Sequence, residues 1–94
     1  MPKNDRPPDD ATLVLAVGGQ LDAETGQALL RDLRQAVNQP QERVEIDLEH
    51  LDDFTPAGIR ALAACRSYMG RFPGGVHVRT RGDTSRRAYL AAFA

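Results

Sequence analysis

Three short strand-like runs, separated by segments of helical pattern, constrain this chain more than any other feature of its sequence. They are residues 12–17 (TLVLAV), 43–48 (RVEIDL) and 76–80 (VHVRT), each about the length of one strand. The first run is apolar on both alternating faces, which predicts a strand that is covered on both sides. Strands joined through crossover helices usually pair in parallel. The order therefore predicts an α/β fold with a small, largely parallel sheet of three to four strands.

About three helices are expected to pack against this sheet. The first covers residues 23–37, with Asp22 as its N-cap and one apolar stripe at helical spacing. The second covers residues 56–70, with Thr55 as its N-cap and a proline at its first position, where no N–H is needed. The last covers residues 84–93, with Tyr89, Leu90 and Phe93 as its apolar side.

The length of the chain, 94 residues, predicts a single domain. Residues 1–11 hold three prolines and five charges and predict a disordered tail, which leaves residues 12–94 as one domain. No apolar run reaches the roughly 18 residues of a membrane span, and the start has no apolar signal-peptide stretch. These features favour a cytoplasmic protein without direct membrane insertion. Cys65 is the only cysteine, which excludes an intrachain disulfide.

The formal net charge of −1 hides an asymmetry along the chain. Residues 1–55 carry twelve acidic and five basic side chains, whereas residues 56–94 carry one acid and seven arginines. Such opposite blocks can steer association with a polarised partner or with another copy of the chain. No aromatic residues interleave with the arginines as a single-strand nucleic-acid platform needs, so the pattern does not favour nucleic acid as a partner.

Tests for catalytic, metal and phosphate sites give no positive result. His50 and His77 are far apart, and neither belongs to a pair with zinc-ligand spacing. Asp52 and Asp53 have no Lys, His or Arg beside them to complete a catalytic group. The glycines of residues 18–20 match no phosphate-binding loop, which makes nucleotide binding the weakest hypothesis. We therefore expect no enzyme, no cofactor and no metal.

One junction of the chain remains as a candidate site. Residues 19–22 and 54–58 both follow predicted parallel strands, at the edge where open α/β sheets place functional sites. Gly58 lies in the first turn of a helix, and two interpretations stay open. Its missing side chain either allows close approach of a partner or packs tightly against the neighbouring loop.

At these residues the chain resembles the STAS domain family of bacterial anti-sigma factor antagonists. Residues 17–25 (VGGQLDAET) are similar to the family's strand ending in G-x-L-D-x-x-T, and residues 44–48 (VEIDL) to its strand ending in D-L. Residues 54–62 (FTPAGIRAL) are similar to its segment D-S-[ST]-G-[LIV]-x-x-L. The resemblance covers most of residues 12–93. It implies a small sheet packed with helices, no catalysis, and a protein-binding surface at the start of the second helix.

The resemblance also implies partner switching, in which an anti-sigma factor that is a kinase phosphorylates a serine of the antagonist. Pro56 occupies that serine position here, so the usual switch cannot operate. Thr55 stands at the family's aspartate position, and both Thr55 and Thr25 keep a hydroxyl group near the same edge. Phosphorylation of Thr55 would destroy the helix cap that this residue is expected to provide.

We expect a non-enzymatic module for protein binding that resembles an anti-sigma factor antagonist and contributes to transcription regulation. Its partner-binding residues are Asp22, Thr25, Asp53, Thr55, Pro56, Ala57, Gly58 and Arg60. The alternative hypothesis is a STAS subunit attached to the ATPase of an ABC phospholipid-transport system. A strand that usually precedes residue 12 in the family is missing, which leaves barer sheet edges and favours pairing with a partner or a homodimer.

Overall fold

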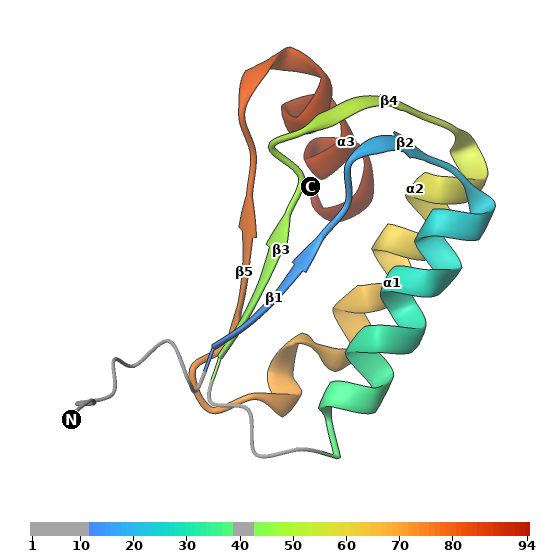
Figure 1. Ribbon diagram of the computed structural model, residues 1–94. Helices are drawn as coiled ribbons and strands as arrows, with labels where there is room; N and C mark the ends of the chain where they lie inside the picture. Colours follow the sequence, from blue (N-terminus) through green and yellow to red (C-terminus); the bar gives the residue numbers. More distant parts are fainter. Residues whose placement is uncertain (1–11, 39–42) are drawn as a thin grey trace, which may run out of the picture.

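The computed structural model describes residues 12–38 and 43–94, so the predicted tail over residues 1–11 lies outside the described part. The main sheet has three parallel strands in the order β1-β3-β5, namely β1 (Thr12–Ala16), β3 (Arg43–Asp47) and β5 (Val76–Arg79). Figure 1 shows α1 (Ala23–Ala36) and α2 (Pro56–Ala64) side by side against one face of this sheet. The third helix, α3 (Gly82–Phe93), packs beside α2 and β4 (Leu51–Phe54). The predicted α/β class, with a largely parallel sheet and three helices, is confirmed.

Two short strands were missed by the sequence analysis. After β1 the chain turns through Gly19, which has a φ of 71°, and forms β2 (Gly19–Leu21), which pairs in parallel with β4. The register shifts between Gly19 and Gln20, so β4 carries Asp52 as an extra residue. Strands of three and four residues rich in Gly and Asp resemble loops in sequence, because neither residue favours β-structure.

The second helical stretch also differs from the prediction. The single helix expected over residues 56–70 is α2 followed by a 3-10 helix, η2 (Cys65–Arg71). This part of the chain contains Ser67, Tyr68 and Gly70, which are poorer helix formers than the alanines and leucine of α2. Within the described residues, no helix combines the length and the apolar character that a membrane crossing requires.

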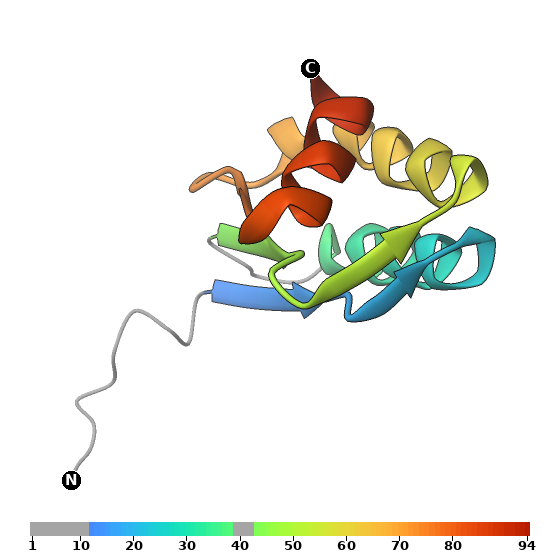
Figure 2. The same ribbon diagram turned by 90° about the horizontal axis from the view of Figure 1, so that it is seen from above.

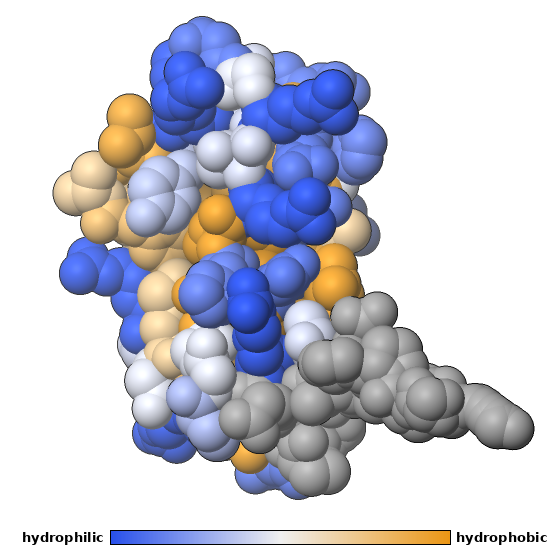
Figure 3. All heavy atoms as spheres, turned by 90° about the vertical axis from the view of Figure 1, so that its left-hand side faces the viewer, coloured by the Kyte–Doolittle hydropathy of each residue, from blue (hydrophilic) through white to orange (hydrophobic). Residues whose placement is uncertain are grey.

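Among the residues that the structure describes, helices cover one face of the main sheet and leave the other open. Val44 and Ile46 on β3 are completely buried on the covered face, while Val14 on β1 is 52% exposed on the other. The expectation that residues 12–17 form a strand covered on both sides is therefore wrong. The helices of this small domain cover one face of the main sheet. Alternate residues of β1 therefore point either to the core or to the surface. Figure 3 shows the open side of the molecule, where hydrophilic side chains surround apolar patches.

The core lies between the sheet and the two helices α1 and α2. Its largest fully buried apolar side chains come from both layers: Leu21, Leu33, Ile46, Leu48, Leu62 and Val44. This core fixes the starts of α1 and α2 at the same end of the molecule (Figure 2).

Candidate functional site

The β2–β4 pair brings the N-termini of α1 and α2 together. Leu21 pairs with Phe54, and the Thr55 N–H donates to the Leu21 carbonyl oxygen at 2.9 Å. Asp22 and Thr55, the N-caps of the two helices, therefore follow paired residues (Figures 1 and 2). We call the eight predicted partner-binding residues at this place the helix-end site.

Asp22 and Thr25 form a capping box at the start of α1. The Thr25 N–H donates to Asp22 Oδ1 at 3.0 Å, and the Asp22 N–H donates to Thr25 Oγ1 at 2.8 Å. The Thr25 hydroxyl lies 2.9 Å from the Gln20 carbonyl oxygen, which can accept its hydrogen. Because the Thr25 backbone N–H and then its hydroxyl hydrogen-bond the carboxylate, the pKa of Asp22 is lowered from 3.8. Asp22 is thus a structural cap that remains ionised at neutral pH.

Thr55 caps α2 in a simpler way. Its Oγ1 accepts a hydrogen bond from the Gly58 N–H at 3.1 Å, and Pro56 occupies the first turn of the helix. The predicted roles of Thr55 as N-cap and of Pro56 at the helix start are confirmed. Pro56 is exposed but brings no hydroxyl group to the surface.

Gly58 is a packing residue at the centre of this arrangement. It is buried, and a Cβ atom added to it would lie 2.1 Å from the Leu21 carbonyl oxygen and 3.0 Å from the Asp22 nitrogen. Of the two interpretations left open, tight packing against the neighbouring loop is the one that the structure shows. The idea that Gly58 gives a partner room to approach is wrong, because the backbone of β2 already fills that space.

A second glycine contact was missed by the sequence analysis. A Cβ atom on Gly26 of α1 would lie 2.6 Å from Cβ of Ala61 on α2 and 3.4 Å from the Gly58 carbonyl oxygen. Gly26 therefore permits α1 and α2 to approach closely just behind their caps. The signal in the sequence was a glycine inside a helical pattern, which often has a packing reason.

The remaining residues of the helix-end site form its surface. Asp53 and Arg60 are exposed, and Ala57 is half-buried between them in sequence. The Asp53 carboxylate accepts a hydrogen bond from the Phe54 N–H at 2.8 Å. The structure thus brings Asp22, Thr25, Asp53, Thr55 and Pro56 to one end, whereas Arg60 lies one turn further along α2.

Helix α3 contributes a contact to this end that the sequence did not predict. The Arg87 guanidinium carbon lies 5.7 Å from the centroid of the Phe54 ring, directly before the cap of α2. Arg87 also pairs with Asp83 one turn earlier, with Nε and Oδ2 3.0 Å apart. Part of the arginine excess of residues 56–94 is therefore used to hold β4 against α3.

One group of potential metal ligands occurs among the described residues, and the sequence analysis did not single it out. The ligand atoms of Asp47, Glu49 and His50 lie within 4.8 Å of one another. Protein groups already contact both carboxylates: Asp47 Oδ1 accepts from the Glu49 N–H at 2.8 Å, and Glu49 Oε2 lies 3.3 Å from Arg79 Nη2. We therefore assign no metal to this group.

Cys65 is completely buried behind α2. Burial raises the pKa of its thiol to about 11, so the thiolate needed for nucleophilic attack is scarce at neutral pH. Cys65 is therefore a packed thiol.

The sequence of the chain matches the profile of a known protein family. The sequence profile of a family described as "Mlab, STAS domain" matches residues 6–85. No curated protein shows significant sequence similarity to the chain. The matched residues include both helix caps, the β2–β4 pair and Gly58.

Proposed function

Because the chain belongs to the STAS domain family, we propose that it is a non-enzymatic protein-interaction module that acts like an anti-sigma factor antagonist. The exposed and half-buried residues of the helix-end site form its partner-binding surface, whereas the buried Gly58 packs α2 against β2. The observation that carries this proposal is the pairing of two helix N-termini by β2 and β4, which gathers the family's motif residues at one end.

The charge of the helix-end site supports a partner with a basic contact surface. Asp53, Asp52 and Glu24 are exposed there, and the carboxylate of Asp22 is ionised at neutral pH. Carboxylates near helix N-termini are favourable in the free protein and complement Lys and Arg side chains of a partner. Arg60 adds one positive charge at the border of this surface, where it can pair with an acidic side chain of the partner.

The hydroxyl groups of the site support binding without a phosphorylation switch. Pro56 has no hydroxyl at the family's phosphoserine position, and Thr55 Oγ1 accepts from the Gly58 N–H. The Thr25 hydroxyl belongs to the capping box of α1. A phosphate on either threonine would remove a cap and destabilise a helix start, so we propose constitutive binding.

A second candidate function is a subunit bound to the ATPase of an ABC phospholipid-transport system. Such a subunit needs permanent attachment and no switch, and the engagement of both threonine hydroxyls in helix caps favours it. Both candidate functions use the same helix-end site. They differ in the identity of the partner, an anti-sigma factor or kinase in one case and a transporter ATPase in the other.

The test is an affinity pull-down from a lysate of the native host, read by mass spectrometry. We expect wild-type protein to recover a partner that Asp53→Lys and Arg60→Glu variants lose by at least tenfold. The matched control is Arg86→Glu, an exposed charge reversal on α3, which should recover as much partner as wild type. The recovered protein decides between the two functions, and equal recovery by all variants would contradict the site.

A further inference from the structure

The two edge strands of the main sheet, β1 and β5, differ in their protection. Each pairs with β3 on one side, and neither pairs with a further described strand on its other side. On β5, His77 and Arg79 are exposed, and Arg79 contacts Glu45 and Glu49 at 3.7 and 3.3 Å. Charged side chains on an edge strand discourage pairing with another chain. The β5 edge is therefore protected by its own side chains.

The β1 edge has none of these protections within its own five residues. Its sequence, TLVLA, holds no charge, no proline and no bulge, and it pairs with β3 without a register shift. Val14, at its centre, is 52% exposed. An uncharged, regular edge strand with an exposed apolar residue is a template for an added strand.

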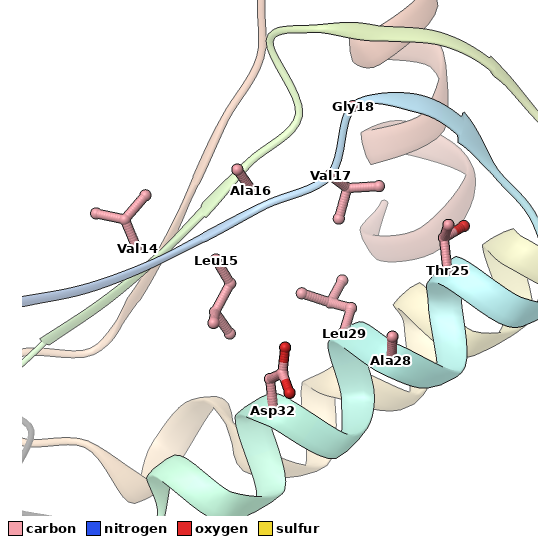
Figure 4. Close-up of a pocket in the computed structure, with 9 residues that line it drawn as sticks. All are labelled: Val14, Leu15, Ala16, Val17, Gly18, Thr25, Ala28, Leu29 and Asp32. Atoms are coloured by element: carbon pink, nitrogen blue, oxygen red, sulfur yellow. The ribbon is translucent and has the colours of Figure 1, made fainter.

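A groove of about 400 Å³ runs beside this edge, between β1 and α1. Figure 4 shows Leu15 and Val17 of the strand side and Leu29 of α1 turned toward the groove, with Asp32 at its rim, whereas Val14 points to the opposite face of the sheet. Asp32 is paired with Arg31 at 3.8 Å, which balances the charge of the rim. A strand added to β1 would place every second side chain in this groove, beside Leu15, Val17 and Leu29.

The sequence of β1 indicates which strand fits. About Val14 the pattern is symmetric, with a leucine on each side and a small or β-branched residue at each end. Two copies of β1 can pair antiparallel about a two-fold axis that passes beside Val14. Leu13 then faces Leu15 of the second copy on the groove side of the sheet. Val14 faces Val14 of the second copy on the open side. Every facing pair is then uncharged and of compatible size.

We propose that β1 is a self-association edge, at which two copies of the chain pair antiparallel and join their sheets. The groove beside β1 receives Leu13 and Leu15 of the second copy. This surface is separate in role from the helix-end site, so the proposal does not depend on the partner-binding function. A pair of five-residue strands buries less than the roughly 1,200 Å² of a standard interface, and the dimer is therefore weak and concentration-dependent.

The first test is sedimentation equilibrium of the full chain up to about millimolar concentration, which suits an interface of this small size. We expect the mass to rise from 10.3 kDa toward twice that value. Val14→Lys places two charges face to face and should weaken the dimer at least tenfold. His77→Lys, the matched change on the β5 edge, should leave it unaltered, and both variants should keep the wild-type circular dichroism spectrum.

The second test is a cross-link that reports the geometry directly. Facing Cα atoms of antiparallel strands are about 4.5–5.5 Å apart, within the reach of a disulfide. Val14→Cys should form a covalent dimer on mild oxidation, while His77→Cys should not, and buried Cys65 should not compete. A wild-type monomer at every concentration, or equal cross-linking of both variants, would overturn the proposal.

Discussion

The two helix starts that meet at the helix-end site are built on different principles. At α1, Asp22 and Thr25 exchange hydrogen bonds between their backbones and side chains, so the start is held by polar groups. At α2, Thr55 makes one cap hydrogen bond, and the buried Gly58 presses the helix against the backbone of β2. The start of α1 depends on hydrogen bonds and charge, and we call it the polar start. The start of α2 depends mainly on close packing, and we call it the packing start.

The two starts therefore use their side chains differently. The start of α2 combines the Thr55 cap with Pro56 in the first turn and the buried Gly58, and Pro56 has no hydroxyl group. The polar start keeps its carboxylate and hydroxyl, but uses both for the cap of α1. At this end, the hydroxyl groups of Thr25 and Thr55 both take part in helix caps.

The largest expected effect comes from breaking the packing start with Gly58→Ala. The new Cβ would lie 2.1 Å from the Leu21 carbonyl oxygen, and backbone cannot yield as a flexible side chain can. We expect the free energy of unfolding to fall by about 3 kcal/mol, as in overpacked cores. Urea denaturation measures this, with Gly70→Ala as the control.

Gly70 has no atom within 4 Å of an added Cβ, apart from its own chain neighbours. Its change to alanine should leave stability unaltered or raise it by up to about 1 kcal/mol, because alanine restricts the unfolded chain. Equal behaviour of the two variants would show that the contact between α2 and β2 is softer than the structure indicates.

A smaller effect is expected from the contact between the two helices, at Gly26 and Ala61. The Gly26→Ala change gains helix propensity but brings two Cβ atoms to 2.6 Å, and we expect a net loss of about 1–2 kcal/mol. Adding Ala61→Gly removes the clash. A double-mutant cycle from urea denaturation should therefore give a favourable coupling energy of about 1–2 kcal/mol. Additive effects would mean that the helices separate freely at this point.

The contrast between a local cap and a packing contact explains what the sequence could and could not predict. Asp22 and Thr55 were identified as caps because a cap is local, and its residues lie within one turn of each other. Gly58 stayed open between two interpretations, since its close contact is with Leu21, 37 positions earlier in the chain. A single sequence states that a side chain is missing there, but not what fills its place.

The short strands and the exposed face of the sheet also depend on residues that are far apart in the sequence. The β2–β4 pair depends on a register between distant residues, including the extra Asp52, and its composition resembles a loop. The apolar run at residues 12–17 indicated a strand correctly, but the number of helices available to cover it decides that Val14 is exposed. Coverage is a property of the whole fold, and the local pattern does not contain it.

The smallest expected effect is a dependence of stability on pH at the start of α1 that the start of α2 does not share. Hydrogen bonds from Thr25 lower the pKa of Asp22 from 3.8, so its ionised form stabilises the folded state above that value. This contribution is lost as the pH falls below 3.8 through the lowered pKa of the folded protein. Asp22→Asn keeps an acceptor for the cap but cannot titrate. The variant should be less stable than wild type at pH 7, and the difference in free energy of unfolding should narrow as the pH falls below 3.8.

Thr55→Ala provides the matched case at α2, since a hydroxyl does not titrate in this range. It should lower the free energy of unfolding by about 1 kcal/mol, equally at pH 7 and at low pH. Thermal or urea unfolding of the three proteins over the acid range measures both gaps. A pH-dependent gap for Asp22→Asn alone would show that charge stabilises only the polar start. Two parallel, pH-independent gaps would show that ionisation of Asp22 adds nothing to the stability of its cap.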